Sequence, residues 1–405
     1  MVSSPATEAK ADAGKKPRRR HAIRRSSVVM RRRTPPGAPP GTLIADPAAL
    51  APVIRFIGYG ADEMEEHEVR SLDELPGRLD RWPVAWVNVD GLGDIELIKD
   101  LGELFGLHRL ALEDVVNVHQ RPKVEEYEDH LFIVIRMLVE DSLAGSEQIC
   151  LFLGERYLLT FQERRGDCFE MVRERLRKGR GLIRQGGPDY LAYALLDAVT
   201  DEYFPALEAM GERLERLEVH ALGRPNSSTF RRAHHAKRQL LSLRRNIWPQ
   251  RELYNTLSRE HTPFIGDRTR IYLRDCYDHA VQLMDMVETY RDIASSLIDL
   301  YLGGVNARMN ETMRVLTVIA TVFMPLGFIA SLYGMNFDTA VSPWNMPELK
   351  WTFGYPFVLL LMLVIAVAML GYFRWRGWLG GEGWLRDVEE PPPGDDAGPA
   401  DHGRT

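Results

Sequence analysis

The sequence contains little cysteine, and none of it in a metal-binding or redox spacing. Cys150, Cys168 and Cys276 are the only three in 405 residues, and they are too far apart for a zinc ribbon or a CxxC pair. The phosphate-binding pattern GxxxxGK[ST] is also missing, and no nucleophile–base pair or cofactor loop can be assembled from the motifs. These absences argue against an enzyme or an ATP-driven machine, and they fit a reducing, cytoplasmic environment for the main body.

The N-terminal segment lacks an apolar stretch long enough for a signal peptide. Residues 1–45 carry eleven basic and two acidic residues and several prolines, which predicts a disordered basic tail. We expect this tail to contact anionic lipid at the cytoplasmic leaflet rather than nucleic acid. Residues 374–405 end in a stretch rich in proline, glycine and acids, and they are expected to form a second cytoplasmic tail.

Charge is absent from two apolar runs in the last fifth of the chain, Val315–Tyr333 and Tyr355–Phe373. Each has about the length that a helix needs to cross a bilayer core of roughly 30 Å, and a buried core helix is the alternative. Arginines precede the first run and follow the second, whereas Lys350 is the only basic residue in the loop between them. This asymmetry predicts that both termini are cytoplasmic. The expected segments are transmembrane helix 315–336, external loop 337–354 and transmembrane helix 355–373.

The rest of the chain predicts a domain followed by a stalk. Within residues 46–170, the β-type runs WPVAWVNVD, HLFIVIRMLVE and QICLFLGERYLLTF alternate with helical runs such as DIELIKDLGELFG, which indicates an α/β domain. Residues 171–314 are expected to form a helical stalk. Its last helix should continue from about Arg268 to Tyr333, roughly 100 Å, because Pro325 is the only proline there. The fold class is therefore α+β, with an α/β cytoplasmic domain, a long helical stalk and two C-terminal transmembrane helices.

Two heptad patterns run along the expected stalk helix. An apolar seam from Leu273 to Val305 predicts packing against partner helices. Asp278, Asp285, Asp292 and Asp299 recur every seven residues and so lie on one face. Such a ladder is usually a solvated face, but like charges in a narrow bundle repel unless a cation or a basic helix offsets them.

A glycine, a methionine and an asparagine close the first apolar run as Gly334-Met335-Asn336. A ring of asparagine amide oxygens can hold a strongly hydrated cation through its water shell without removing the waters. Gly334 would let the backbone turn out of the helix, and an ordinary helix-ending glycine is the alternative. One face of the run is small, polar or flexible, which indicates either a pore lining or close helix packing. Its residues are Asn310, Met313, Thr317, Ala320, Met324, Gly327 and Ser331.

With this motif at the end of a charge-free span, the chain resembles the CorA family of magnesium and cobalt transport proteins. Segments such as LEDVVNVHQRPKVEEYEDHLFIVIRM and RNIWPQRE look like the family's cytoplasmic segments, and the resemblance extends over about residues 50–380. It implies a homopentameric channel of the bacterial inner membrane. Such a channel admits hydrated Mg²⁺, and also Co²⁺ or Ni²⁺, passively and under the membrane potential.

The resemblance also implies site residues. Gly334, Met335 and Asn336 would form the selective mouth, and Asn310, Met313, Leu316 and Met324 would line the pore. Family members often have threonine where Gly327 stands, which puts one polar ring in doubt. A regulatory Mg²⁺ that closes the channel would bind between Asp114 and Asp275 of neighbouring subunits, with Glu113, Asp197 and His279 near a second site. For Asp114, an ordinary surface helix position is the alternative.

Two other functions remain open at this point. A transporter of the same fold can move zinc or cobalt as its main cargo. A membrane-anchored signalling or scaffold protein would need only a stalk that associates, and it predicts neither the Gly-Met-Asn mouth nor the stripe of small residues.

Overall fold

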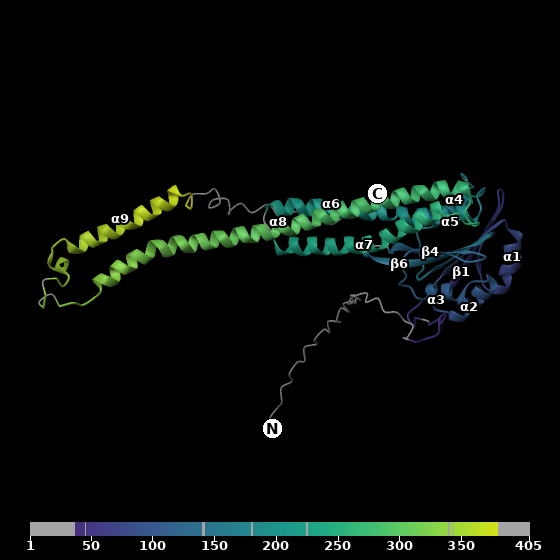
Figure 1. Ribbon diagram of the computed structural model, residues 1–405, viewed down its shortest axis with the longest axis horizontal. Helices are drawn as coiled ribbons and strands as arrows, with labels where there is room; N and C mark the ends of the chain where they lie inside the picture. Colours follow the sequence, from purple (N-terminus) through teal and green to yellow (C-terminus); the bar gives the residue numbers. More distant parts are fainter. Residues whose placement is uncertain are drawn as a thin grey trace, which may run out of the picture. The chain divides into compact units, whose positions relative to one another are not determined.

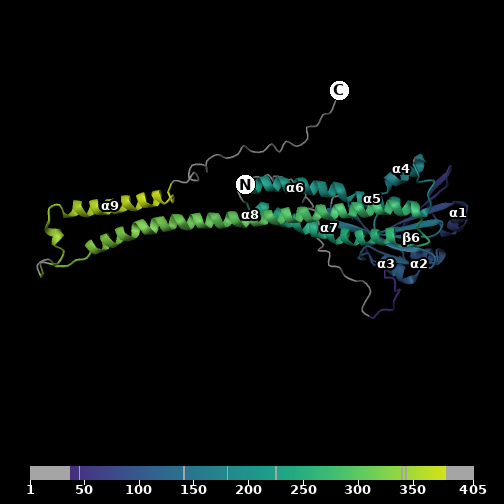
Figure 2. The same ribbon diagram turned by 45° about the horizontal axis from the view of Figure 1, so that its top comes forward.

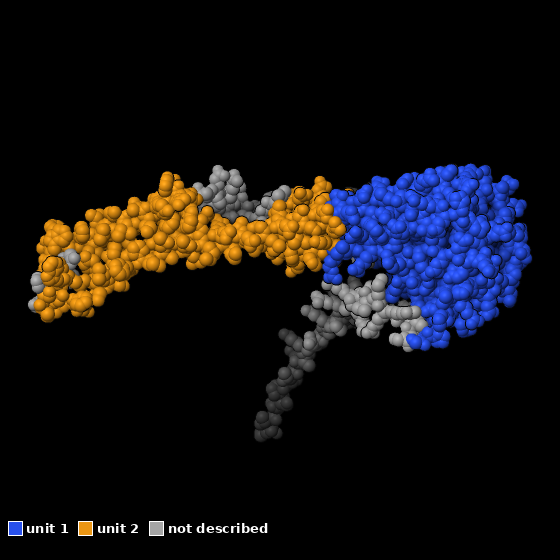
Figure 3. Space-filling model, in the orientation of Figure 1, with its two compact units in different colours: residues 1–211, 238–290 blue, residues 212–237, 291–405 orange. Residues whose placement is uncertain are grey.

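The computed structural model describes residues 37–44, 46–139, 142–179, 181–223, 226–338, 341–342 and 344–379 (Figure 1). The chain divides into two compact units, coloured separately in Figure 3. Residues 1–211 with 238–290 form the first unit, and residues 212–237 with 291–405 form the second. The predicted tails lie for the most part outside the described residues.

The first unit is built around a seven-stranded sheet in the order β2-β1-β3-β7-β6-β5-β4. β3 and β7 pair in parallel, and the other neighbours pair antiparallel. The three β-type runs of the sequence are confirmed as β3, β5 and the β6–β7 pair. The strands are β1 (Val53–Tyr59), β2 (Met64–Val69), β3 (Val84–Asp90), β4 (Lys123–Glu126), β5 (Leu131–Val139), β6 (Ser142–Leu153) and β7 (Tyr157–Gln162).

Helices cover both faces of this sheet. A 3₁₀ turn (Leu72–Glu74) and α1 (Leu75–Arg81) follow β2. Figures 1 and 2 show α2 (Ile95–Leu104) and α3 (Arg109–Val116) across the sheet from α4 (Glu170–Lys178) and α5 (Pro188–Asp201). All seven residues of β3 are buried, because a strand covered on both faces has no solvent side. The core over the α2–α3 face includes Phe56, Val87, Leu101, Leu112 and Phe152.

Two boundaries differ from those that the sequence predicted. Leu43 packs against the core, and the backbone N–H of Gly41 donates to the carboxylate of Glu113 at 2.7 Å. The ordered part therefore begins before residue 46. At the other end, α5 packs on β3, β5, β6 and β7, so it belongs to the sheet domain although the sequence placed it in the stalk.

Three long helices follow: α6 (Tyr203–Gly223), α7 (Ser227–Arg259) and α8 (Asp267–Tyr333). α8 is one unbroken helix of 67 residues with Pro325 inside it, which confirms the predicted continuous helix. It contains residues of both units.

The N-terminal part of the apolar seam of α8, from Leu273 to Ala294, is largely buried within the single chain, so packing there needs no partner subunit. Val305, at the other end of the seam, is exposed. Leu273, Ala280, Met284 and Val287 are all buried. Helices of the same chain lie beside it. For example, the ring of Tyr272 on α8 lies 5.4 Å from the ring of Tyr190 on α5. The four ladder aspartates are exposed instead.

The second unit contains the end of α8 and α9 (Gly354–Trp375), with a 3₁₀ turn (Pro347–Lys350) in the loop before α9. Both helices are long and apolar enough to cross a membrane, as predicted. They pack together through a small cluster of Val318, Val322 and Phe373.

A buried ion pair attaches α4 to the sheet. Asp167 and Arg173 are each 4 % exposed and lie 2.5 Å apart, and the guanidinium of Arg173 stacks on Trp86. Burial alone would raise the pKa of Asp167, but the hydrogen bonds and charge of Arg173 lower it below the usual value. The pair is therefore ionised at neutral pH.

We expect Asp167→Ala to destabilise the protein by up to about 3–5 kcal/mol, because the buried charge of Arg173 then keeps only the more distant carboxylate of Glu170, at 3.5 Å, among the described residues. Chemical denaturation of the full-length protein in detergent, followed by circular dichroism, measures this. Glu174→Ala is the matched control. Among the described residues that exposed carboxylate pairs with Lys178 alone, and its removal should change stability by less than about 0.5 kcal/mol. Asp167→Leu combined with Arg173→Met should recover most of the loss. Equal stability of the Asp167 and Glu174 variants would contradict this role.

Candidate functional site

The Gly-Met-Asn segment follows directly on the last turn of α8. The N–H of Gly334 donates to the carbonyl of Ala330 at 3.0 Å, and that of Met335 donates to Leu332 at 3.3 Å. Gly334 does not adopt a positive φ, so it is not a left-handed helix-ending glycine. A Cβ there would lie 3.3 Å from the Ala330 carbonyl oxygen, a tight approach. Asn336 is exposed, and within the described residues its amide has no hydrogen-bond partner.

The predicted stripe lies on the side of α8 that faces away from α9. Val318, Val322 and Leu326 form the side that packs against α9. Ala320 and Met324 follow two residues later, which is about 200° around the helix. Every stripe residue is exposed, and Met324 is 73 % exposed. Leu316 is also exposed. Small and flexible side chains therefore occupy a helix face that the chain itself does not cover.

A cluster of possible metal ligands lies between α5 and α8 in the first unit. Asp197, Asp201 and His279 each offer a ligand atom, and these atoms lie within 4.8 Å of one another. Nδ1 of His279 lies 3.9 Å from Oδ1 of Asp201 and, although buried, has no hydrogen-bond partner among the described residues. Asp275 adds a carboxylate oxygen 3.9 Å from Nε2 of the same histidine. Carboxylate and imidazole ligands at this spacing suit a divalent cation.

Burial raises the pKa of Asp197 in this cluster, and the nearby charge of Asp201 raises it further. The hydroxyl of Tyr193 and the thiol of Cys276 donate to the two oxygens of this carboxylate at 3.4 and 3.7 Å. A bound cation would offset the repulsion between the two aspartates.

We expect divalent metal binding at this cluster to weaken as the pH falls. Because the pKa of Asp197 is raised, its carboxyl takes up a proton at a higher pH than an ordinary aspartate, and that proton competes with the metal. Co²⁺ titration followed by visible absorption between pH 8 and 5 measures this. His279→Gln removes the imidazole ligand, so that any remaining pH dependence belongs to the carboxylates, and Asp292→Asn on the exposed ladder is the control. A pH-independent affinity in the His279→Gln protein would contradict the role of Asp197.

Asp114 and Glu113 lie on α3, apart from this cluster. The carboxylate of Asp114 accepts from Nζ of Lys123 at 2.6 Å and from Nε2 of Gln120 at 2.7 Å. Glu113 is buried and accepts from the Gly41 N–H. Within one chain, then, Asp114 already has a cationic partner that a metal would have to displace.

The sequence identified part of this cluster and missed the rest. Within one chain, Asp197 and His279 lie close together, whereas Glu113 lies on α3, apart from them. Asp201 was missed, although it follows Asp197 by four residues on one helix, as His279 follows Asp275. This i, i+4 spacing on two helices was the available signal. Lys123 was also missed.

Comparisons with known proteins agree on one family. The profile of CorA-like Mg²⁺ transporter proteins matches residues 84–375. The cobalt/magnesium transport protein CorA of Thermotoga maritima is 45 % identical over 347 residues, covering 85 % of this chain and 97 % of that protein. The putative metal ion transporter YfjQ of Bacillus subtilis is 36 % identical, covering 77 % and 96 %.

A solved structure has the same fold. The CorA magnesium transporter of Methanocaldococcus jannaschii superposes with a TM-score of 0.69 at 23 % identity, and the match covers 82 % of this chain and 99 % of that one. At this identity, the match is evidence for the arrangement of elements alone.

Proposed function

Because the chain belongs to the family of CorA-like Mg²⁺ transporter proteins, we propose that it forms a homopentameric channel for hydrated Mg²⁺ in the bacterial inner membrane. The chain is thus a CorA-family Mg²⁺/Co²⁺ transporter with two candidate membrane helices, and not an enzyme. The proposal adds three points: the pentameric assembly, passive uptake under the membrane potential, and closure of the channel by bound metal. The observation that carries it is the exposed stripe of α8, which ends at a free asparagine amide.

Five copies of the stripe, one from each subunit, would enclose a central pore. Asn336 would form a ring at the outer mouth, where neutral amide oxygens accept hydrogen bonds from the water shell of Mg²⁺ without removing it. Asn310 and Met313 would line the inner end. Leu316 and Met324 would narrow the pore and close it by excluding water. α9 would face lipid on the other side of α8.

The driving force would be the membrane potential. Both termini would lie in the cytoplasm, as the arginines flanking the spans predict. An inside-negative potential favours entry by about 2.3 kcal/mol per charge for each 100 mV, so a divalent ion gains twice that amount. No energy-coupling site is needed for uptake by this route.

Bound metal in the cytoplasmic part would hold the channel closed. Asp275 of one subunit and Asp114 of its neighbour would share a cation, with Glu113 of that neighbour beside Asp197 and His279 at a second site. Mg²⁺ keeps most of its waters and needs only one or two carboxylates. A cation there would also offset the repulsion within the exposed ladder, which favours the closed state.

Growth of a bacterial strain without its own magnesium uptake systems tests the transport function. Expression of this chain should restore growth at low Mg²⁺ and make the cells sensitive to Co²⁺. Adding Zn²⁺ as the only supplement separates a zinc transporter from this proposal. Failure to restore growth, although the protein is present in the membrane, would overturn it.

A further inference from the structure

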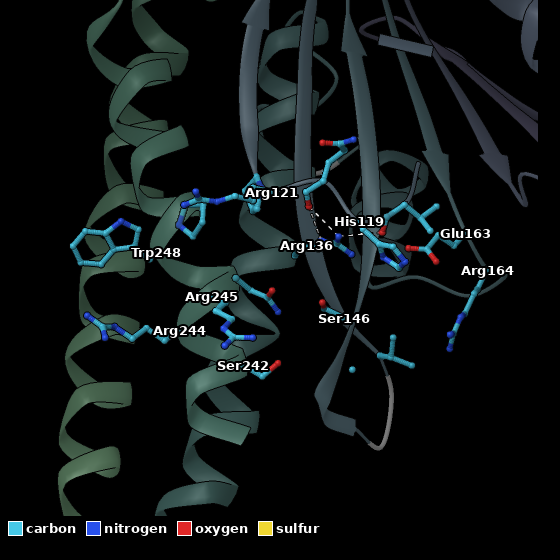
Figure 4. Close-up of a pocket in the computed structure, with 17 residues that line it drawn as sticks. His119, Arg121, Arg136, Ser146, Glu163, Arg164, Ser242, Arg244, Arg245 and Trp248 are labelled. Carbon is cyan, nitrogen blue, oxygen red and sulfur yellow. Dashed lines mark hydrogen bonds between the residues drawn. The ribbon is translucent and has the colours of Figure 1, made fainter. Parts of the chain in front are cut away.

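A basic cavity of the first unit has no part in the transport mechanism. It has a volume of about 940 Å³ and lies between α7 and the strand edge near β5 and β6 (Figure 4). Figure 4 shows Ser242 and Arg245 on α7 opposite Ser146 and Arg136 on the strands, with Arg121 and His119 beside them. Hydrogen-bond donors therefore face the cavity from both walls.

Arg136 is a buried cation without a carboxylate partner. It is 6 % exposed, and its Nε and Nη2 donate to the carbonyl of Gln120 at 3.1 and 2.9 Å, while Nη2 also donates to that of Val118. Among the described residues no carboxylate lies within ion-pair distance of it. The charge of Glu163 in the same lining acts on Arg136 but forms no ion pair with it. The buried positive charge is therefore only partly offset, and such a charge favours an anion beside it.

The other charged residues of the cavity also favour an anionic ligand. In the part of the chain that the structure describes, Arg121 and Arg245 are exposed and form no ion pair. Glu163 is the only acidic residue in the lining, and it accepts from the backbone N–H of Gln148. Arg244 is already engaged, because it pairs with Glu288 and stacks on Trp248. Arg164 also belongs to the lining, but Figure 4 shows it on the side away from α7. Arg121, Arg136 and Arg245 are thus the three arginines placed for one ligand.

We propose that this cavity binds a small polyphosphate anion, either free or as the phosphate tail of a nucleotide. Guanidinium groups match the geometry of phosphate oxygens and bind them in pairs. Three guanidiniums from separate elements match several linked phosphates better than one carboxylate or one orthophosphate. The volume lies in the range of about 300–1,000 Å³ that small-molecule sites occupy. The proposal does not depend on which metal the channel carries.

Isothermal titration of the full-length protein in detergent, with EDTA present and at fixed ionic strength, tests this. Pyrophosphate, ATP and orthophosphate are the three probes. We expect saturable binding of pyrophosphate or ATP, and at least about tenfold weaker binding of orthophosphate. Tighter binding of pyrophosphate identifies a free polyphosphate as the ligand, and tighter binding of ATP identifies a nucleotide.

The variant Arg121→Ala/Arg245→Ala should bind the preferred probe at least about tenfold more weakly, because it loses two charged donors. Arg70→Ala/Arg259→Ala removes the same charge from exposed positions outside the cavity and should bind as the wild type does. Size-exclusion chromatography verifies that both variants assemble. Any one of three results would overturn the proposal: no saturable binding, equal affinity for orthophosphate, or equal losses in the two double variants.

Discussion

Asn336→Ala should reduce Mg²⁺ uptake by at least about tenfold while the protein still assembles. The amide of Asn336 is exposed and has no partner in the described residues, so truncating it removes no internal contact. A hydrogen bond to a charged group contributes about 1.5–3 kcal/mol, and the hydrated cation presents such a charge through its waters. Loss of the ring at the mouth therefore removes the interaction that selects the ion.

Asn345→Ala is the matched control for this variant. It lies in the same loop, and its amide is already used, since it donates to the carbonyl of Asp338 at 2.7 Å. We expect that variant to keep most of its uptake. If correctly assembled Asn336→Ala transports Mg²⁺ at the wild-type rate, the amide does not hold the ion.

Asp114→Asn combined with Asp275→Asn should abolish closure by Mg²⁺. In the proposed pentamer without metal, the carboxylates of neighbouring subunits and the exposed ladder would repel one another. A shared cation offsets this repulsion, and a coupling of about 1–3 kcal/mol per site shifts the open and closed populations about 5–150-fold. Limited proteolysis of the stalk, with and without millimolar Mg²⁺, should show protection in the wild type and none in the double variant.

A substitution of Lys123 should shift the Mg²⁺ dependence of this protection in the opposite sense. Its ammonium group occupies the Asp114 carboxylate, so Lys123→Gln should make protection appear at a lower Mg²⁺ concentration. Glu174→Gln changes an exposed carboxylate outside both the metal cluster and the ladder and serves as the control. Protection of the double variant equal to that of the wild type would place the sensor elsewhere.

The elements that the sequence predicted are those with a strong, simple pattern. Val315–Tyr333 and Tyr355–Phe373 have no charge, and β3 and β5 are mostly apolar, with Asn88, Asp90 and Arg136 as the exceptions. β2 was missed because its sequence MEEHEV is mostly charged, as suits an exposed edge strand. The β-strand propensity of its residues alone does not identify such a strand.

Tertiary partners were harder to predict than elements. The seam from Leu273 to Val305 has the heptad spacing of an intermolecular coil, but periodicity does not say which chain supplies the partner, and here it is largely the same chain. α8 ends at Tyr333, directly before Gly334, and the backbone leaves the helix there without a left-handed conformation. The contact of Lys123 with Asp114 joins β4 to α3, and the sequence pattern does not indicate it.

Ion flux into proteoliposomes is the most direct test of the central claim, that this chain forms a passive Mg²⁺ channel. The full-length protein is reconstituted around a Mg²⁺-sensitive dye, and a potassium gradient with valinomycin sets the potential. We predict Mg²⁺ entry that requires the protein and that accelerates as the interior is made more negative. Entry no faster than in protein-free vesicles, or entry that ignores the sign of the potential, would contradict the claim.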